Sequence, residues 1–371
     1  MFNLMQQAQL GELHFKSVAR AQLKAIVAIH SNRRGTALGG CRLLPYNSDE
    51  EAVQDAINLA RSMSYKAALA ELPQGGGKAV IIEPEAPYDR QQLLLAFADF
   101  INELGGRYVT AVDSGTHSQD MDILASRSQY VTSTSIAGNP SPYTAQGVLL
   151  GIQVAVASQL RHDSLKGIHI AIQGLGQVGM SLAKAAHAQG AHLTVADTNP
   201  QQVKAAQALL HCDSVDARDI FSVPCDVLAP CALGGCINDQ TLPRLQCAII
   251  AGSANNQLAH ASLAQQLHQR GILFAPDYAI NAGGLIFVSL RHYQHAELEV
   301  IDKKIRQIGT TLQEIFLQAR HQQSDTLSVC ERLAEAKLHL HAPHPAQYTQ
   351  QALANTSQAT PNKGGLHAPH H

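Results

Sequence analysis

The segment HIAIQGLGQVG, residues 169–179, decides the fold of the second half of the chain. It begins with an apolar strand pattern and continues with glycines in the spacing GxGxxG. In that spacing the first glycine permits a tight turn, the second lets a phosphate approach the backbone, and the third lets a helix pack closely on the strand. The segment therefore predicts a strand, a glycine-rich turn and a helix whose amino end faces a pyrophosphate. The residues expected at that site are Gly174, Gly176, Gln177, Val178 and Gly179.

The next strand pattern, HLTVAD at 192–197, ends at Asp197, 18 positions after Gly179. A carboxylate at about this distance is typical of dinucleotide-binding folds, where it accepts a hydrogen bond from the ribose 2′-hydroxyl. Because a carboxylate repels a 2′-phosphate, the pattern favours NAD over NADP. The alternatives are a packing turn that binds nothing and an Asp197 that is simply a surface acid.

Clean alternation of strand and helix patterns surrounds this segment and predicts a doubly wound, Rossmann-type NAD-binding domain over residues 136–325. Helical patterns lie at 177–189 and 200–211, and an apolar, Ala-rich stretch at 145–159 precedes them. The expected strands lie at 169–174, 192–197, 226–232, 248–254 and 273–281.

Residues 1–135 alternate strands and helices in a different way and contain no dinucleotide fingerprint. Helical patterns at 49–70 and 89–104 separate short apolar runs, so the sequence predicts a second α/β layer with some parallel strand pairing. The expected strands lie at 24–30, 36–44, 78–83 and 108–113.

Composition limits the possible partners. The chain has 371 residues, which at roughly 100–200 residues per domain predicts about two domains. Only 15% of the residues are charged and the formal net charge is −2, so binding to nucleic acid or to an anionic membrane through bulk charge is not expected. No apolar run approaches the ~20 residues that a membrane-spanning helix needs, and the N-terminus lacks a signal-peptide pattern.

Cysteine usage indicates a reducing compartment. There are seven cysteines, an odd number, and they form no CxxC pair. Such a set predicts neither a disulfide framework nor a common zinc site. We therefore expect buried free thiols, no metal centre and a cytoplasmic location.

Two lysines and one aspartate of the first half have the chemistry of an active site. Lys78 follows three glycines and enters an apolar strand, where partial desolvation makes a neutral amine accessible and allows the lysine to act as a general base. Lys66 lies in the helical stretch SYKAALA, and Asp113 ends the strand YVTAVD. The alternatives are ordinary surface or structural lysines, and an Asp113 that caps a helix at 118–126.

Several motifs in the same order resemble the Glu/Leu/Phe/Val dehydrogenase family, and within it the leucine dehydrogenases most closely. The resemblance runs from about residue 10 to 340. It implies an N-terminal domain for substrate binding and oligomerisation, a C-terminal Rossmann domain, and a helix over 326–340 that returns to the first domain. The motifs are ALGGCR (37–42), MSYKAALAELPQGGGKAVI (63–81), GRYVTAVDSGT (106–116), GNPSPYTAQGV (138–148), GLGQVG (174–179), DVLAPCALGG (226–235), IAGSANNQL (250–258) and APDYAINAGGLI (275–286).

The resemblance implies roles for matching residues. Lys66 would hold the substrate α-carboxylate, helped by the backbone at Gly39 and Gly40. Lys78 would activate water and stabilise the carbinolamine, and Asp113 would carry protons to and from the amino group. The implied reaction is the reversible, NAD-dependent oxidation of an amino acid to a 2-oxo acid and ammonia.

Three further residues gain roles through the same resemblance. Thr144 would help to hold the cofactor's carboxamide, and Asn255 would lie near the nicotinamide. Asn281 would lie near both the substrate and the cofactor. The family also implies a closed homo-oligomer, without fixing the number of subunits.

The implied substrate pocket is apolar, with Leu38, Ala111, Leu285 and Val288 as its lining. In glutamate enzymes of the family a lysine stands at the position of Leu38, so glutamate is disfavoured here. We expect branched or short aliphatic amino acids such as leucine, valine and isoleucine, with phenylalanine as the alternative. Two other hypotheses are a non-catalytic NAD-binding sensor and a 2-hydroxy-acid dehydrogenase. Loss of Lys78 or Asp113 would support the sensor, but both are present, and a 2-hydroxy-acid dehydrogenase favours a histidine-based acid/base pair with an arginine for the carboxylate.

Residues 341–371 are rich in His, Gln, Pro and small residues, with no helical or strand period. Such a segment buries too little apolar surface to offset the entropy of ordering, so we expect a disordered tail.

Overall fold

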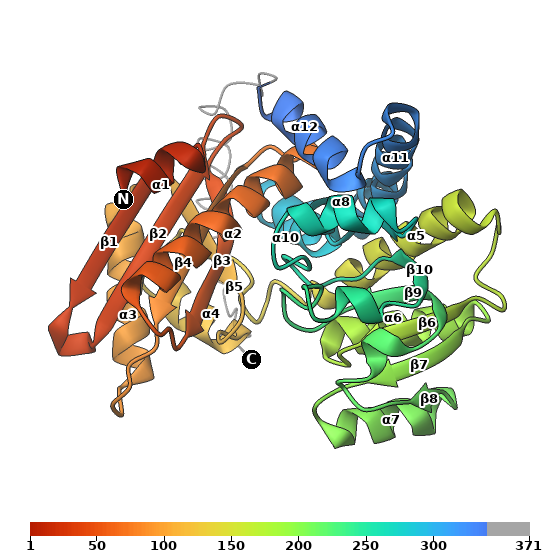
Figure 1. The fold of residues 1–371 in the computed structure, drawn as a ribbon. Helices are drawn as coiled ribbons and strands as arrows, with labels where there is room; N and C mark the ends of the chain where they lie inside the picture. The colour runs from red at the N-terminus through yellow and green to blue at the C-terminus, as the bar shows by residue number, and fades with distance from the viewer. Residues whose placement is uncertain (340–371) are drawn as a thin grey trace, which may run out of the picture.

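The structure is a computed structural model that describes residues 1–339. Two sheets lie side by side, each covered by helices (Figure 1). The first sheet is mixed and the second is entirely parallel, which confirms the predicted fold class. The expected disordered tail, 341–371, lies outside the described residues.

The first sheet has the strand order β1-β2-β4-β3-β5. β1 pairs antiparallel with β2, and β2 pairs antiparallel with β4, whereas β3 pairs parallel with both β4 and β5. A helix crosses over between β3 and β4, as a parallel pair requires. The strands are β1 (Glu12–Val18), β2 (Leu23–Ser31), β3 (Ala37–Leu44), β4 (Gly75–Ile82) and β5 (Tyr108–Val112).

Helices cover both faces of the first sheet. On one face Val53 and Ile57 of α2 are buried in one cluster with Ile26 and Val80 of the strands. On the other face α3 and α4 bury Phe97 and other apolar side chains. The side chain of Ser48 caps α2 by accepting a hydrogen bond from the Glu51 amide. The helices of this half are α1 (Phe2–Gln7), η1 (Ala19–Ala21), α2 (Asp49–Leu69), α3 (Arg90–Glu103) and α4 (Ser118–Ala125).

The second sheet has the order β11-β10-β9-β6-β7-β8. The strand order reverses between β6 and β9, and in open α/β sheets ligands bind at the carboxyl ends of the strands at such a switch point. The strands are β6 (His169–Gln173), β7 (His192–Ala196), β8 (Asp213–Ser214), β9 (Cys225–Pro230), β10 (Cys247–Ile250) and β11 (Leu273–Phe274). The helical segments beside them are α5 (Ser141–Leu160), α6 (Gln177–Ala188), α7 (Pro200–Leu210), η2 (Ile220–Ser222), η3 (Leu242–Arg244) and α8 (Ser262–Gln269).

One predicted strand, 273–281, is largely wrong. Only Leu273 and Phe274 are extended as β11, and a short helix follows directly after Pro276. Proline cannot donate a ladder hydrogen bond and is well suited to the start of a helix. The continuous apolar pattern therefore spans a strand end and a helix.

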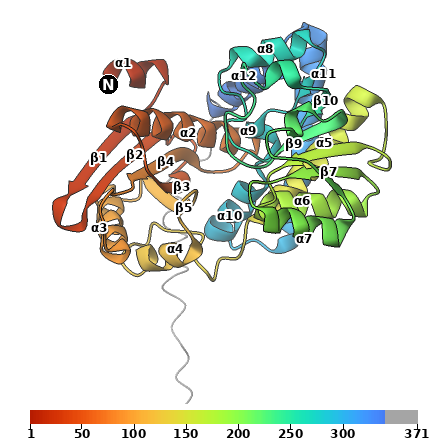
Figure 2. The same ribbon diagram turned by 60° about the horizontal axis from the view of Figure 1, so that its bottom comes forward.

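The C-terminal helices join the two halves. α2 extends toward the second half and packs against α9 and α12 (Figure 2). Arg34 of the first half donates a hydrogen bond to the Lys337 carbonyl oxygen on α12 at 3.0 Å. One buried cluster also runs from Tyr65 and Leu69 of α2 into the core of the second sheet. The helices are α9 (Asp277–Ile280), α10 (Gly283–Gln294), α11 (Leu298–Gln322) and α12 (Thr326–His339).

Candidate active site

The buried Lys78 forms an ion pair with the partly buried Asp113. Lys78 lies in β4 with 4% of its surface exposed, and Asp113 follows the end of β5. Gly40 makes this pair possible, because a Cβ at that position would collide with the Asp113 side chain. Gly39 has the same effect against the backbone of Gly77 on β4. The two adjacent glycines of the ALGGCR motif thus let three neighbouring strands approach closely enough for the lysine and the carboxylate to meet.

Hydrogen bonds in the turn after β5 fix the backbone at Asp113. The Asp113 backbone N–H donates to Thr116 Oγ1 at 3.0 Å, and the Thr116 hydroxyl donates to the Cys41 carbonyl oxygen at 2.8 Å. The residue before α4 is His117, not Asp113, so Asp113 does not cap this helix. The acid is therefore free of a structural capping role.

Arg42 is a second cation at Asp113 and was missed by the sequence analysis, although it ends the ALGGCR motif. Its Nε lies 3.6 Å from Asp113 Oδ2. Burial alone raises the pKa of Asp113, but the charges of Lys78 and Arg42 outweigh this effect and hold the pKa below its usual value. Arg42 depends on contacts between distant segments, so no local pattern marks it.

Lys66 connects the first half to the second. It lies near the end of α2, is 7% exposed, and its Nζ donates to Asn255 Oδ1 at 2.9 Å. Asn281 Nδ2 donates to the same oxygen at 2.9 Å. The structure thus brings together three residues that the sequence analysis placed at the substrate and the nicotinamide.

The electrostatics around Lys66 set it apart from a surface lysine. Burial lowers the pKa of Lys66 to about 8, with Lys78 adding to this effect and Asp277 and Asp113 opposing it. Asp277 is itself buried, which raises its pKa, and its Oδ2 accepts a hydrogen bond from the Asn256 amide at 2.7 Å. The sequence analysis missed Asp277 as well, because it fell inside the wrongly predicted strand.

The four apolar residues expected to line the substrate pocket lie on three elements. Leu38 on β3 and Ala111 on β5 are buried, and Ala111 pairs in register with Gly40. Leu285 and Val288 are half-buried and lie three positions apart on α10, so they share one helix face. Both halves of the chain therefore supply apolar side chains of this set, two that are buried in the first sheet and two that are half-buried on α10.

The glycine-rich turn has the shape that the fingerprint predicts. Gly174 adopts a φ of +93°, and a Cβ there would collide with Ala232. A Cβ at Gly179 would collide with the Gly174 carbonyl group. Gly176, in contrast, is exposed and faces open space. The first and third glycines are required by packing, whereas the space beside the second is available to a phosphate group.

The amino end of α6 lies at the same turn. Val178 is half-buried, while Gln177 is exposed and its Oε1 accepts hydrogen bonds from Asn139 Nδ2 at 3.0 Å and Ser141 Oγ at 3.2 Å. The free N–H groups of the first helical turn and the helix dipole favour an anion here. These features fit the pyrophosphate of NAD.

Asp197 lies beside this turn at the end of β7. Its Oδ2 accepts from the Leu175 amide at 2.6 Å and its Oδ1 accepts from the Asn199 amide at 2.7 Å. A carboxylate has about four acceptor sites, so each oxygen can accept a further hydrogen bond from a ribose hydroxyl. Asp197 therefore fits the ribose-binding role and also fixes the shape of the turn.

Thr144 contacts the backbone of its own helix and the start of α10. Its Oγ1 donates to the Pro140 carbonyl oxygen at 3.3 Å in the first turn of α5. A Cβ on Gly284 would collide with the same hydroxyl, so Thr144 packs closely against the start of α10. This places Thr144 next to the helix that carries Leu285 and Val288.

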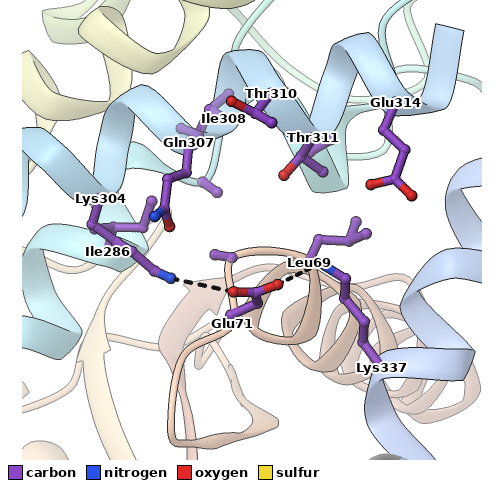
Figure 3. A pocket seen from close by; sticks show the side chains of 13 residues that line it. Leu69, Glu71, Ile286, Lys304, Gln307, Ile308, Thr310, Thr311, Glu314 and Lys337 are labelled. Atoms are coloured by element: carbon purple, nitrogen blue, oxygen red, sulfur yellow. Dashed lines mark hydrogen bonds and ion pairs between the residues drawn. The ribbon is translucent and has the colours of Figure 1, made fainter. Parts of the chain in front are cut away.

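A cavity of about 300 Å³ lies at the junction of α2, α10, α11 and α12 (Figure 3). Glu71 projects into it and pairs with Lys337 at 2.7 Å and Lys304 at 3.8 Å. None of the predicted site residues lines this cavity. Its two cations are already paired with Glu71, so it serves here as a charged connection between the two halves.

The described residues contain neither a metal-binding cluster nor a membrane-spanning helix. Among residues 1–339 no group of His, Cys, Asp and Glu side chains has the geometry of a metal site. No helix in this part of the chain is long and apolar enough to cross a membrane.

Comparison with known proteins gives consistent matches. Residues 12–130 match the Glu/Leu/Phe/Val dehydrogenase dimerisation domain, and residues 193–339 match the Glutamate/Leucine/Phenylalanine/Valine dehydrogenase family. The chain is 43% identical to the leucine dehydrogenase of Geobacillus stearothermophilus, over 91% of this chain and 93% of that protein. It is 40% identical to the valine dehydrogenase of Streptomyces coelicolor, over 87% and 90%.

A solved structure agrees with the architecture. The crystal structure of L-tryptophan dehydrogenase from Nostoc punctiforme superposes with a TM-score of 0.78 at 39% identity, covering 91% of this chain and 98% of that one. The expected family and the expected cofactor are thereby confirmed. The chain belongs to the Glu/Leu/Phe/Val dehydrogenase family, whose members are NAD-dependent, and is an amino acid dehydrogenase.

Proposed function

We propose that the chain catalyses the reversible oxidative deamination of a branched-chain or short aliphatic L-amino acid, such as leucine, valine or isoleucine. The products are a 2-oxo acid, ammonia and NADH. One observation carries this proposal: two buried lysines, Lys66 and Lys78, lie together with the partly buried carboxylate of Asp113 where the two halves of the chain meet.

The substrate carboxylate is assigned to Lys66, helped by the backbone at Gly39 and Gly40. A buried ammonium group is costly without a counter-ion, and the present partner of Lys66 is a neutral amide oxygen of Asn255. An incoming carboxylate supplies the missing negative charge. Substrate binding therefore removes an electrostatic cost that the free enzyme bears.

Proton movement is assigned to Lys78 and Asp113. In the direction of oxidation Asp113 takes a proton from the substrate ammonium group, which gives the neutral amine. When bound near Gly174, Gly176 and Gly179, NAD supplies the chemistry of accepting hydride from the substrate Cα. Lys78 in its neutral form then takes a proton from the water that adds to the C=N carbon, which gives the carbinolamine. Asp113 returns its proton to the nitrogen, and as the C–N bond breaks the carbinolamine hydroxyl passes its proton to Asp113, so that the 2-oxo acid and ammonia are released.

The junction between the two halves positions the reacting atoms. Lys66 on the first half and Asn255 and Asn281 on the second are joined by hydrogen bonds. We assign Asn255 and Thr144 to the nicotinamide end of the cofactor and Asn281 to the substrate. Holding the halves together in this way aligns the Cα with the cofactor and keeps bulk water out.

The choice of an aliphatic substrate follows from the apolar lining. Leu38 is 1% exposed and offers no charge to a side-chain carboxylate, so a glutamate side chain would be buried without compensation. Ala111, Leu285 and Val288 extend this apolar surface. Relatives that act on leucine, valine and tryptophan are all similar to this chain, so the size of the preferred side chain is the part to be measured.

We also propose a homo-oligomer that works in the cytoplasm. The first half matches a dimerisation domain, and β1 forms one edge of its sheet with Phe15 54% exposed. All seven cysteines are free, as expected in a reducing compartment. Light scattering of the full chain would give the number of subunits.

A substrate panel tests the proposal. Purified enzyme is assayed for NAD reduction with L-leucine, L-valine, L-isoleucine, L-phenylalanine, L-tryptophan and L-glutamate at equal concentrations. We expect the highest kcat/KM with one of the three aliphatic amino acids. Preference for phenylalanine or tryptophan over all three would overturn the aliphatic assignment while leaving the amino acid dehydrogenase intact.

A further inference from the structure

Arg42 and Lys78 approach the same oxygen of Asp113 from two neighbouring strands. Arg42 Nε lies 3.6 Å from Asp113 Oδ2, and Lys78 Nζ pairs with that same atom. Arg42 on β3 is in register with Val80, two positions after Lys78 on β4. Because side chains two positions apart share one face of a sheet, both cations reach Asp113 from the face that α2 covers.

A second ion pair, with Asp55 on α2, holds the Arg42 side chain in place. Its Nη1 donates to Asp55 Oδ2 on α2 at 2.9 Å, and the Tyr46 hydroxyl donates to the same oxygen at 2.7 Å. The Arg42 side chain is only 17% exposed and that of Asp55 24%. The guanidinium group therefore has a second carboxylate partner, which holds it in place whatever the state of Asp113.

Most of the other titratable groups near Asp113 are neutral or belong to an ion pair of their own. Burial raises the pKa of Cys41 on β3 and of Tyr108 on β5 far above their usual values, so both are neutral. Asp120 and Arg90 beyond Cys41 form their own ion pair at 2.8 Å. Lys66 on α2 is a further cation that interacts electrostatically with Asp113.

This arrangement matters at one step of the proposed reaction. Before the substrate gives up its ammonium proton, Lys78 must already be neutral while Asp113 is still ionised. In that state the attraction between Lys78 and Asp113 is lost, and without Arg42 the partly buried Asp113 carboxylate would lack its adjacent counter-charge. Leaving one member of a buried ion pair alone is strongly unfavourable. A permanent cation that is separately anchored removes this difficulty.

We propose that Arg42 is a positioning residue that holds the Asp113 carboxylate ionised and in place while Lys78 is neutral, until Asp113 takes the ammonium proton of the substrate. The inference rests on the proposed function, since it assigns the proton exchange to Lys78 and Asp113. Arg42 contacts neither substrate nor cofactor in this role and acts through Asp113. Arginine suits the task because it stays protonated at every pH at which the enzyme works.

The test compares the pH profiles of kcat/KM for the wild type, Arg42→Gln and Arg42→Lys. The charge of Arg42 helps to hold the pKa of Asp113 below its usual value, so removing it strengthens proton binding by Asp113 and the pH at which activity rises must move upward. An opposite charge at this range shifts a carboxyl pKa by about 1–3 units, so we expect the acidic limb of Arg42→Gln to move up by at least about one pH unit. Arg42→Lys keeps the charge and should keep the limb within a few tenths of a unit.

Controls separate this role from folding. Arg107 pairs with Glu12 at the other end of the same sheet and is not part of the site, so Arg107→Gln should retain the wild-type profile. Thermal unfolding of each variant checks that it is folded. If Arg42→Gln is unstable, Arg42→Met replaces it, because the methionine stem fills the space of the arginine stem without a second polar group.

Each outcome has one meaning. An upward shift in the neutral variant together with an unshifted limb in Arg42→Lys supports the inference. Unchanged profiles in all variants, or equal shifts in Arg42→Lys and the neutral variant, overturn it. A wild-type enzyme without amino acid oxidation would instead overturn the proposed function, so the two failures are distinguishable.

Discussion

Lys66 Nζ donates a hydrogen bond to Asn255 Oδ1 at 2.9 Å, although the two residues are 189 positions apart in the chain. Lys66 belongs to the half that carries Lys78 and Asp113, and Asn255 follows β10 in the half that carries the glycine-rich turn. Asn281 donates to the same oxygen and fixes its orientation. This contact joins the assigned substrate site to the assigned cofactor site, so each half can influence the other.

Asn255→Ala should weaken catalysis more than stability. The side chain is exposed, so its loss removes no buried apolar surface, but it leaves Lys66 and Asn281 without their shared partner. A hydrogen bond to a charged group contributes about 1.5–3 kcal/mol, so kcat/KM for the preferred amino acid should fall by roughly 10–100-fold. Steady-state assays measure this, and Asn58→Ala on the exposed face of α2 is the matched control. Equal losses in both variants would remove the special role of Asn255.

Lys66→Met should abolish useful activity and yet stabilise the fold near neutral pH. Burial lowers the pKa of Lys66 to about 8, against about 10.4 in the unfolded chain, so the unfolded state binds more protons between these values. Below pH 8 the folded enzyme bears the full cost of the buried charge, up to about 3 kcal/mol. Above about pH 10.4 this cost vanishes.

The gain in unfolding free energy of Lys66→Met over wild type should therefore be largest below pH 8 and should decline as the pH rises toward 10. Asp277 loses a neighbouring cation in this variant, which reduces the gain. Urea unfolding at pH 7, 8.5 and 10 measures the difference. A gain that is constant with pH would show that Lys66 is charged or neutral to the same extent in both states.

The two outer glycines of the GLGQVG turn should respond differently from the central one. Gly176→Val places a side chain in the open space assigned to the pyrophosphate, at a position whose φ of −64° any residue adopts. NADH binding should weaken by at least about tenfold, with the melting temperature nearly unchanged.

Gly179→Val collides with the Gly174 carbonyl group and should lower the melting temperature by several degrees. Fluorescence titration and thermal unfolding measure both quantities. Undiminished NADH binding by Gly176→Val would place the cofactor elsewhere.

Leu285→Ala should change substrate preference. Removing this half-buried side chain from α10 enlarges the assigned pocket, and each methylene is worth about 1–3 kcal/mol of discrimination. The kcat/KM of the variant for valine should fall roughly 5–50-fold, while the ratio of phenylalanine to valine activity should rise. Leu317→Ala on the exposed side of α11 is the control. An unchanged ratio would show that Leu285 does not line the substrate pocket.

The features that could be predicted from the sequence are those that depend on a short stretch of residues. The glycine-rich turn and Asp197 were predictable because a strand, a turn and a helix follow one another within a short stretch with fixed spacing. Lys78 and Asp113 were predictable as candidates because each lies at a special point of one strand. The edge strand β1 was missed because its alternating residues are only partly buried, which weakens the apolar pattern.

Residues whose roles depend on contacts between distant segments could not be predicted from the sequence. Arg42 gains its place from Asp55, 13 positions away, and from Asp113 on another strand. Asp277 was hidden because the apolar run 273–281 combines a strand end, a proline and a short helix. The bridge from Glu71 to Lys304 and Lys337 likewise forms only when α2 meets α11 and α12 (Figure 3).

The most direct test is the oxidation of NADH with 2-oxoisocaproate, measured with and without ammonium for wild type and Lys78→Ala, alongside NADH binding by fluorescence. We predict that the wild type oxidises NADH only when ammonium is present, and that Lys78→Ala loses at least about 100-fold in rate while still binding NADH. Oxidation that needs no ammonium, or full activity in Lys78→Ala, would contradict the assignment of this chain as an amino acid dehydrogenase that works through Lys78.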